Sequence, residues 1–392
     1  MKKLFCYGAS PTVVTGLGTV SKNLLSSLSS DFEITVLGIN DRGGWKDPKL
    51  YPYKIYPAIY YPFDDKWGVI RLLRYFQGKD PEIKFEEPDI FFVNNDFFLF
   101  HTIHTEEVSF YDLITKVIPP KTKKVLYTPV DSDEIYLEWL PVFGFFDEVV
   151  VPSYFGRSVL KKYLKKEVKV IYYPLDTKNY FPQENNDKPK DKFIIGYVGR
   201  NQYRKDLFRL IYIFSLFKQN HKDAFLYIHT QPKDRNNQGW DLFALANHLN
   251  LKEGRDFYFP DVDDNKGVSV DMMRKTYNYF DVFLSCSTCE GFGLPYAEAS
   301  LCEVPVLIPD NTTAYDFKQY LTVYKSGPVH SFGFIDGNRI RRLADIDDAL
   351  LKLEDVYNNK EKYKQKAKKA REFFLQFSSS NIGKKFSTLL TK

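Results

Sequence analysis

Cysteine is scarce in this sequence, since its 392 residues include only four: Cys6, Cys286, Cys289 and Cys302. Four cysteines scattered over a chain of this length do not form the dense disulfide framework of small secreted domains. Cys286 and Cys289 have the spacing of half a zinc knuckle, but no second pair accompanies them, so we interpret all four as ordinary thiols. The sequence therefore predicts a reducing environment and no structural zinc.

Long apolar runs and a large charge excess are missing as well. Nowhere do about 18 apolar residues follow one another, so no transmembrane helix is predicted, and the apolar run at residues 4–7 is too short for a signal peptide. The 55 Lys and Arg residues nearly balance the 50 Asp and Glu residues, giving a net charge of +5. No basic stripe is interleaved with stacking aromatics, which argues against nucleic acid as a partner. The basic face at residues 161–166 admits at most peripheral contact with a membrane or an anionic acceptor.

Two sets of alternating apolar strands and amphipathic helices follow one another along the chain. A chain of 392 residues exceeds what one hydrophobic core usually serves, so we expect two domains. The first set opens with the strand at residues 4–7 and the second with a strand at residues 193–199, and the polar segment 183–191 reads as a linker between them. We therefore assign residues 1–182 and 192–372 to two Rossmann-like α/β domains.

A glycine-rich turn between a strand and a helix carries the strongest functional signal. The apolar run 282–284 predicts a buried strand, and Pro295 stands where a helix can begin without losing a hydrogen bond. Gly291 and Gly293 lie between them, so the backbone can turn tightly and let a ligand approach its N–H groups. Because a helix N-terminus after such a turn binds anions readily, the turn predicts a phosphate site.

Two carboxylates bracket this turn, Glu290 before the glycines and Glu298 in the first turns of the helix. A ligand with negative charge in its middle and hydroxyl groups at both ends would satisfy the turn and both carboxylates together. A sugar nucleotide has this shape. The alternative is an ordinary strand–turn–helix connection with two solvated glutamates, and the particular sequence between the two carboxylates argues against it.

A basic turn follows another strand end. The strand at residues 193–199 runs into Arg200, and Lys205 follows just before an amphipathic helix at 207–217. Ligands of parallel sheets collect at the carboxyl ends of the strands, which is where this turn lies. A solvated basic loop is the alternative interpretation.

The segment 290–299, EGFGLPYAEA, resembles the signature of glycosyltransferase family 4, whose members are retaining enzymes of the GT-B fold. The resemblance includes Arg200 and Lys205 and covers most of the chain. It implies two Rossmann-like domains that face each other across a cleft, with residues 373–392 crossing back to the first domain. The many Phe, Tyr, Lys and Asn residues fit an AT-rich genome, such as that of a large DNA virus.

The resemblance implies that Arg200 and Lys205 clamp the donor diphosphate. A leaving nucleoside diphosphate gains negative charge as the glycosidic bond breaks, and one well-placed cation or donor stabilises that charge by about 3 kcal/mol. Because these basic residues neutralise the diphosphate, we expect no metal and no other cofactor. Asp261 and Asp263 spell an Asp-x-Asp motif that holds a metal in another class of glycosyltransferase, and we interpret them here as loop acidity.

The same resemblance assigns the glycine-rich turn to the sugar and the ribose. Glu290 and the amides of Phe292, Gly293 and Leu294 are expected to hold the transferred sugar and its phosphate. Glu298 is expected to bind the ribose of the donor.

The acceptor side is marked by fewer residues. Gly16 and Gly18 lie in a loop before a helix that we expect to begin near Thr19, and in the family such a loop approaches the donor phosphates and the acceptor. A plain strand–helix turn is the alternative. At a second strand end, where many family members have a histidine, this chain has Asp131. We interpret Asp131 as orienting the acceptor hydroxyl, and an ordinary turn or capping carboxylate is the alternative.

Taken together, these features predict a retaining hexosyltransferase that moves a hexose from a nucleotide diphosphate sugar, GDP-mannose by preference, to a hydroxyl group on a glycan, lipid or protein. Two alternatives stay open: a sugar-nucleotide epimerase of the same architecture, and a non-catalytic sugar-nucleotide-binding protein. We expect a cytoplasmic location, in the host cytoplasm if the gene is viral. For the oligomeric state, the sequence is compatible with a monomer and with a homodimer.

Overall fold

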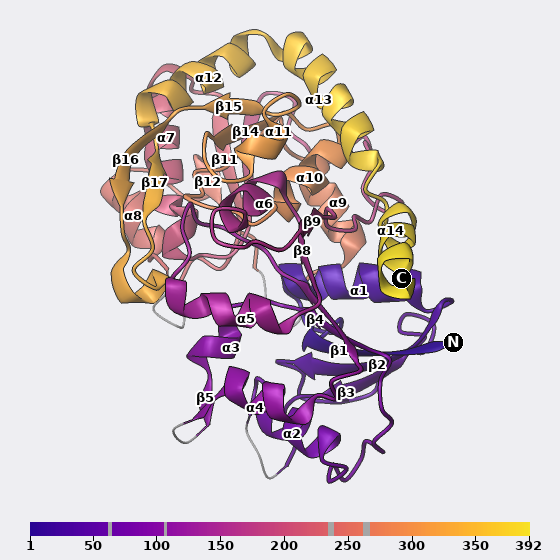
Figure 1. Cartoon of the computed structure of the whole chain (residues 1–392). Helices are drawn as coiled ribbons and strands as arrows, with labels where there is room; N and C mark the ends of the chain where they lie inside the picture. Colours follow the sequence, from indigo (N-terminus) through magenta and orange to yellow (C-terminus); the bar gives the residue numbers. More distant parts are fainter. Residues whose placement is uncertain (62–64, 106–107, 234–238, 262–266) are drawn as a thin grey trace. The chain divides into compact units, whose positions relative to one another are not determined.

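The computed structural model describes residues 1–61, 65–105, 108–233, 239–261 and 267–392 (Figure 1). The chain divides into two compact units. The first unit comprises Met1–Val130, Glu134–Pro174 and Phe377–Lys392, and the second comprises Asp131–Asp133 and Leu175–Gln376. The polar segment 183–191, interpreted from the sequence as a linker, therefore lies inside the second unit.

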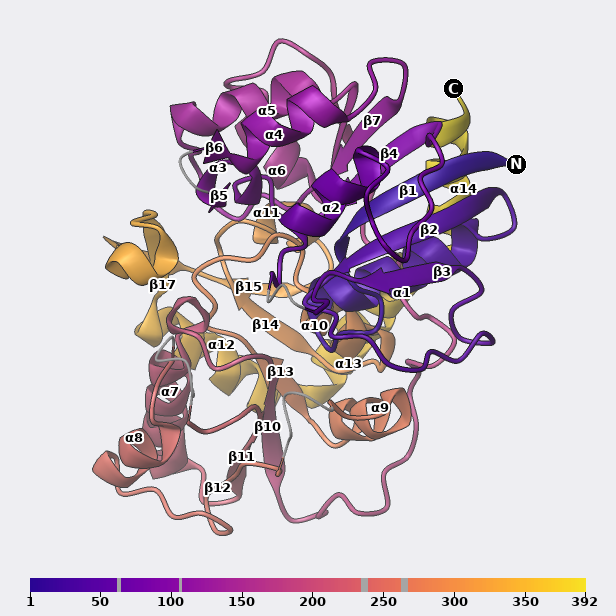
Figure 2. The ribbon, with the colours of Figure 1, turned by 90° about the horizontal axis from the view of Figure 1, so that it is seen from below.

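The first unit is built on a seven-stranded parallel sheet with the strand order β3-β2-β1-β4-β7-β8-β9. Figure 2 shows β3, β2, β1, β4 and β7 following one another in this order. Helices cover both faces of this sheet, which explains why its central strands are almost wholly apolar. The strands are β1 (Lys2–Ala9), β2 (Phe32–Ile39), β3 (Lys54–Pro57), β4 (Ile90–Asn94), β7 (Lys123–Tyr127), β8 (Glu148–Val151) and β9 (Val168–Val170).

Helices from both ends of the chain pack against this sheet. The C-terminal helix α14 lies against α1, and its Phe386 ring contacts Tyr127 of β7 at 4.8 Å between centroids. The opposite face is covered by an aromatic-rich core drawn mainly from α2, α4, α5 and α6. The helices are α1 (Gly16–Leu28), α2 (Val69–Phe76), α3 (Leu99–Thr102), α4 (Phe110–Val117), η1 (Leu137–Trp139), α5 (Leu140–Phe145), α6 (Tyr154–Leu160) and α14 (Ser379–Thr391), and a two-stranded ribbon joins β5 (His104–Thr105) to β6 (Val108–Ser109).

The second unit has its own parallel sheet of six strands, in the order β12-β11-β10-β13-β14-β15. Its strands are β10 (Phe193–Val198), β11 (Ala224–His229), β12 (Phe257–Tyr258), β13 (Val282–Leu284), β14 (Val306–Pro309) and β15 (Thr322–Tyr324). An antiparallel hairpin, β16 (Ser326–His330) with β17 (Arg341–Ala344), follows the last strand. The short helix η3 (Gly333–Asp336) lies between its two strands.

Helices sandwich this second sheet too. Tyr357 of α12 packs on Phe193 of β10 at 5.0 Å between ring centroids, while Tyr296 of α10 packs on Phe283 of β13 at 6.0 Å. The helices are η2 (Tyr203–Lys205), α7 (Leu207–Asn220), α8 (Leu242–His248), α9 (Val270–Asn278), α10 (Leu294–Leu301), α11 (Ala314–Phe317), α12 (Ile346–Asn358) and α13 (Lys360–Leu375).

The predicted α/β class with two Rossmann-like domains is confirmed by these two parallel sheets. One local expectation is corrected: α1 begins at Gly16 and not near Thr19, because the Thr15 hydroxyl accepts a hydrogen bond from the Gly18 amide at 3.0 Å and caps the helix there. Gly16 and Gly18 thus lie in the first turn of the helix. A side chain at residue 18 would meet the Val13 carbonyl oxygen at 2.2 Å, so only glycine fits.

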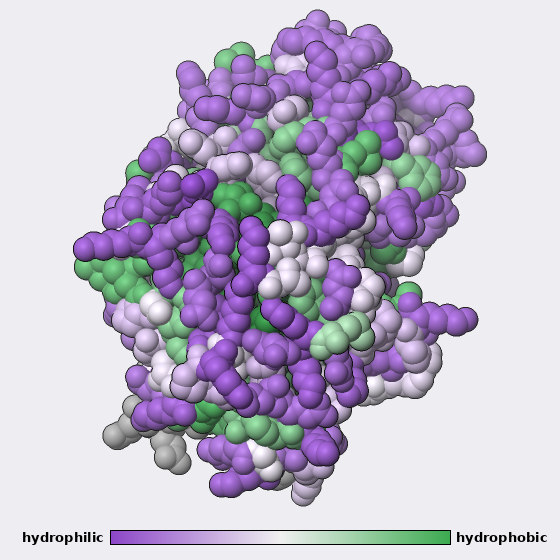
Figure 3. All heavy atoms as spheres, turned by 45° about the vertical axis from the view of Figure 1, so that its right-hand side comes forward, coloured by the Kyte–Doolittle hydropathy of each residue, from purple (hydrophilic) through white to green (hydrophobic). Residues whose placement is uncertain are grey.

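The surface is predominantly polar on the face that Figure 3 shows, where apolar residues occur in small separate patches. Within the described ranges, no helix is both long and apolar enough to cross a bilayer.

Candidate functional site

The glycine-rich turn predicted between strand and helix is present between β13 and α10. Gly293 immediately precedes α10 with a φ of 87°, a conformation that favours glycine. A Cβ at this position would also lie 2.4 Å from the Tyr296 ring, so a larger residue cannot be accommodated. Pro295 lies in the first turn of α10, where its missing N–H costs nothing. The turn therefore presents a helix N-terminus built without bulky side chains.

Phe292 belongs to this turn but not through its side chain. Its ring is 1% exposed and packs edge-on against Phe317, with 5.4 Å between centroids. The ring therefore anchors the turn in the core. The role expected of Phe292, Gly293 and Leu294 in holding the phosphate can accordingly involve only their backbone amides.

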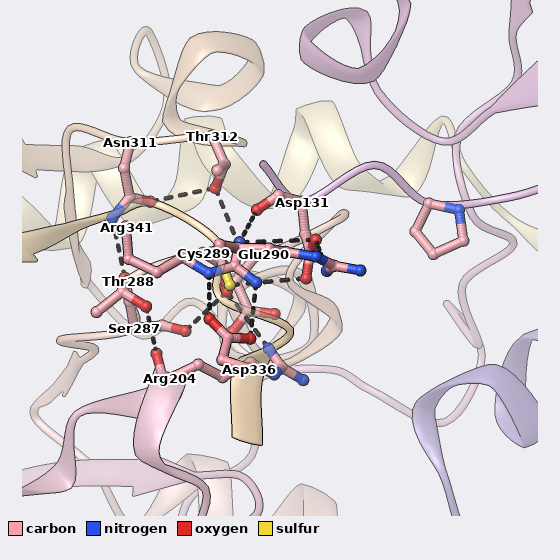
Figure 4. Close-up of polar contacts among 12 residues, drawn as sticks. Asp131, Arg204, Ser287, Thr288, Cys289, Glu290, Asn311, Thr312, Asp336 and Arg341 are labelled. Atoms are coloured by element: carbon pink, nitrogen blue, oxygen red, sulfur yellow. Dashed lines mark hydrogen bonds and ion pairs between the residues drawn. The ribbon is translucent and has the colours of Figure 1, made fainter. Parts of the chain in front are cut away.

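Glu290 and Lys205 form an ion pair, although they lie 85 residues apart in sequence. Their side chains are 13% and 11% exposed. Burial, together with the positive charge of Arg204, lowers the pKa of Lys205, whereas Glu290 acts in the opposite direction. The Glu290 amide donates to the Thr312 hydroxyl at 3.0 Å, which fixes the backbone that carries this carboxylate (Figure 4).

The loop that carries Lys205 is tied directly to the glycine-rich turn. The carbonyl oxygen of Arg204 accepts hydrogen bonds from both the amide and the hydroxyl of Thr288, at 2.8 and 2.9 Å (Figure 4). Immediately after Lys205, Asp206 adopts a left-handed conformation and caps α7 by accepting from the Arg209 amide. These bonds place the basic turn after β10 beside the turn before α10.

Arg200 is placed differently from Lys205. It follows β10 as expected, but its side chain is exposed, and no hydrogen bond or ion pair joins it to any described residue. Of the two cations predicted to form the diphosphate clamp, the structure therefore brings Lys205 alone into contact with the glycine-rich turn.

Asp131 lies among arginines. Arg339 Nη1 donates to its Oδ1 at 2.8 Å, Arg341 Nη1 donates to its backbone oxygen, and the Cys289 thiol lies 3.6 Å from its Oδ2 (Figure 4). Burial would raise the pKa of Asp131, but the charges of Arg341, Arg339 and Arg204 outweigh it and hold that pKa well below its usual range. Asp131 thus stays ionised, and its carboxylate already has three protein partners: Arg339, Arg341 at 3.6 Å and the Cys289 thiol.

Arg341 connects this carboxylate to the hairpin. Its side chain is 1% exposed and makes a bidentate ion pair with Asp336, with bonds of 2.6 and 2.9 Å. Planar bidentate pairing of this kind fixes orientation as well as charge. The hairpin β16–β17 therefore holds Arg339 and Arg341 against Asp131 in one defined arrangement.

Glu298 is the fifth residue of α10, just over one turn from the start of the helix. The Tyr277 hydroxyl of α9 donates to its Oε2 at 2.7 Å. Burial raises the pKa of Glu298 to about 7, although hydrogen bonds from Tyr277 and Tyr180 act in the other direction. The carboxyl group is therefore poised to change protonation near neutral pH.

Gly16 and Gly18 belong to the first unit, where a buried carboxylate supports the loop before them. Asp41 is 4% exposed and accepts hydrogen bonds from the hydroxyls of Ser10 and Thr12 at 2.9 and 3.1 Å. Asp41, which follows β2, therefore fixes the loop that runs from β1 into α1.

Sequence reasoning missed Arg204, Arg339 and Arg341. Arg204 carried a usable signal, because it stands next to Lys205 in the same basic turn. Arg339 and Arg341 carried none, since their partner Asp131 lies 208 and 210 residues away.

Among the described residues, no group of three or more His, Cys, Asp or Glu residues is arranged to hold a metal ion. The predicted Asp-x-Asp reading falls partly on residue 263, which lies outside the described residues.

Comparison with known proteins gives a family match for part of the chain. Residues 181–373, nearly all of the second unit, match a family described as glycosyl transferases group 1. No protein with a curated description matches the sequence significantly.

Several solved structures share the fold over the whole chain. Sucrose-phosphate synthase from Thermosynechococcus elongatus has a TM-score of 0.74 at 12% identity, with 100% of this chain and 98% of that chain covered. HepE from Anabaena, in complex with UDP-glucose, has a TM-score of 0.68 at 13% identity, with both chains covered fully. A variant of TarM from S. aureus, in complex with fondaparinux, α-GlcNAc-glycerol and UDP, has a TM-score of 0.67 at 12% identity, again with full coverage of both. The predicted GT-B fold is thereby confirmed.

Proposed function

We propose that this protein is a retaining glycosyltransferase that moves a hexose from a nucleotide diphosphate sugar to a hydroxyl group of a glycan, lipid or protein. The observation that carries the proposal is the contact between Lys205 and Glu290 at the N-terminus of α10, with Glu298 further along the same helix. A cation and a carboxylate are thus paired just before a helix N-terminus, and a second carboxylate follows on the same helix. This arrangement fits a ligand with a diphosphate between two groups of hydroxyls.

Each group has a role in this proposal. The amides at the start of α10 and the Lys205 ammonium stabilise the negative charge that grows on the leaving diphosphate. Glu290 accepts hydrogen bonds from the hydroxyls of the transferred sugar, and Glu298 accepts them from the ribose. Arg200, exposed and without a protein partner among the described residues, is available to the diphosphate.

The proposed reaction keeps the configuration at the anomeric carbon. The acceptor hydroxyl attacks from the side of the leaving group, the bond from the anomeric carbon to the phosphate oxygen breaks, and that oxygen takes the hydroxyl proton. No side-chain nucleophile is needed in this scheme. Asp131, proposed from the sequence to orient the acceptor, would have to do so while paired with Arg339.

The donor is proposed as a class, with its base and sugar to be decided by titration. The sequence resemblance favours GDP-mannose, whereas the HepE and TarM structures contain UDP or UDP-glucose. Calorimetric titration with GDP-mannose, UDP-glucose and UDP-N-acetylglucosamine separates these. We expect one donor to bind clearly more tightly than millimolar. If none does, the proposed donor site is wrong.

Turnover distinguishes transfer from the two alternatives. Incubation with the donor that binds, with and without simple glycoside acceptors, should release nucleoside diphosphate in the wild type and almost none in Glu290→Ala. A matched control, Glu253→Gln, changes an exposed carboxylate elsewhere in the second unit and should leave the rate unchanged. Conversion of the donor to another sugar nucleotide would identify an epimerase, and binding without turnover in the wild type would identify a binding protein.

The location of the protein and its lack of a cofactor are proposals as well. We propose that the protein acts in the cytoplasm and makes at most peripheral contact with a membrane. The absence of a metal or other cofactor is likewise proposed from the basic residues at the site.

A further inference from the structure

The cationic side chain of Arg204 makes almost no hydrogen bonds to the described residues. A guanidinium group carries five N–H donors. In the described part of the chain, the only hydrogen bond from this one runs from Nη1 to the Cys289 carbonyl oxygen, and at 3.5 Å it is long. The neighbouring arginines differ, since Arg341 is held in a bidentate pair by Asp336 and Arg339 is bonded to Asp131.

The backbone of Arg204 is nevertheless fixed. Its carbonyl oxygen accepts two hydrogen bonds from Thr288, so the residue is bound to the turn that leads into α10. Figure 4 shows Arg204 and Glu290 in the same cluster of polar contacts. A fixed backbone with a guanidinium that keeps most of its donors unused is the arrangement expected of a ligand-binding arginine, because little ordering is required when the ligand arrives.

The charges around Arg204 also lack balance. Lys205 is neutralised by Glu290, and the pair Arg339 and Arg341 by Asp131 and Asp336. No carboxylate of the described residues lies within ion-pair distance of Arg204. Burial would lower the pKa of Arg204, but Cys289, Glu290 and Asp131 raise it above its usual value, so the side chain stays charged. One positive charge is therefore left over beside Lys205.

We propose that Arg204 is a further binding residue for the donor, donating to an oxygen of its diphosphate together with Lys205. The inference rests on the proposed function and adds to the pair Arg200 and Lys205 a third cation. Two adjacent cations repel each other, which contributes to the lowered pKa of Lys205, and a bound dianion relieves that repulsion. Arginine suits the task because its planar fork matches two phosphate oxygens at once.

Binding of nucleotides with and without phosphates tests this assignment. The wild type and Arg204→Gln are titrated calorimetrically with UDP and GDP and with uridine and guanosine. In the wild type, one nucleoside diphosphate should bind more tightly than its nucleoside. Because charged hydrogen bonds contribute about 1.5–3 kcal/mol, the variant should lose about 10- to 100-fold in diphosphate affinity while nucleoside affinity stays constant. Arg255→Gln, a change of an exposed arginine before β12, serves as the control and should bind like the wild type.

The outcomes separate the inference from the proposed function. If the wild type binds neither diphosphate, the proposed function fails, and this inference with it. If the wild type binds and Arg204→Gln shows the same diphosphate preference, only the role of Arg204 is overturned. A merely structural role would weaken the nucleoside and the diphosphate in equal proportion, and this too overturns the inference. Should Arg204→Gln not fold, Arg204→Lys keeps the charge but loses the fork, and an undiminished diphosphate preference in that variant contradicts the assignment.

Discussion

The half-buried carboxyl group of Glu298 should make the stability of the second unit depend on pH in a specific direction. Burial raises its pKa from the ordinary value of 4.5 to about 7. The folded state therefore binds this proton more tightly than the unfolded chain does. The resulting stabilisation is fully present below about pH 4.5, and it is lost as the pH rises to about 7.

The size of the effect follows from the same shift. A difference of about 2.5 between 7 and 4.5, at 1.36 kcal/mol for each pKa unit, gives about 3 kcal/mol. Glu298→Gln removes the titration but keeps an oxygen that accepts from the Tyr277 hydroxyl. We therefore expect the variant to gain about 3 kcal/mol relative to the wild type between pH 4.5 and pH 8.

Urea unfolding of both proteins at several pH values in this range measures the difference. Hydrogen exchange of peptides from α10 assigns the unfolding event to the second unit. Glu253→Gln, an exposed carboxylate of the same unit, provides the control, and its stability relative to the wild type should not change with pH. Parallel stability curves for Glu298→Gln and the wild type would show that folding does not shift the pKa of Glu298, and the argument from burial would then be refuted.

Three further substitutions test other contacts. The Arg71 side chain of α2 is fully buried and pairs with the equally buried Asp80 at 3.1 Å. Arg71→Met should therefore lower the free energy of unfolding of the first unit, measured with urea, by about 3–5 kcal/mol. A loss near zero would contradict this burial. Adding Asp80→Asn to Arg71→Met should recover part of the loss. Phe386→Ala should destabilise the first unit by about 3–5 kcal/mol, because its ring fills the space between α14 and the sheet, and unaltered unfolding would mean that α14 contributes little. Lys205→Met should lower the rate of transfer by about 100- to 1,000-fold in steady-state assays, and a rate within a factor of about two of the wild type would exclude Lys205 from the chemistry.

The parts of the fold that local patterns control could be predicted from the sequence. Apolar strands alternating with amphipathic helices indicate parallel sheets, and both sheets are present. The turn before α10 was also predictable, because Gly293 and Pro295 each have a local conformational reason for their position. The start of α1 was misplaced, although Thr15 offered a capping signal three residues before Gly18.

Contacts between residues far apart in the sequence could not be predicted from single segments. Asp131 was interpreted from its place at a strand end, but its surroundings come from a hairpin more than 200 residues later. That hairpin had no clear strand signal, since β16 has the sequence SGPVH, with glycine and proline inside it and three exposed residues. A charge pattern of this kind emerges only when distant loops are brought together by the sheet.

The ion pair of Lys205 and Glu290 has a consequence for donor binding. A buried ammonium group without a partner would be strongly destabilising, so the site needs an anion even when it is empty, and Glu290 supplies it. On the proposed function, the diphosphate takes over Lys205 and leaves Glu290 free for the sugar hydroxyls. Binding then exchanges one ion pair of Lys205 for another, and the sugar hydroxyls replace the ammonium group as hydrogen-bond donors to Glu290. On the role inferred for Arg204, which pairs with no carboxylate among the described residues, its positive charge adds to that of Lys205. A dianion would then be favoured over the single carboxylate that it displaces.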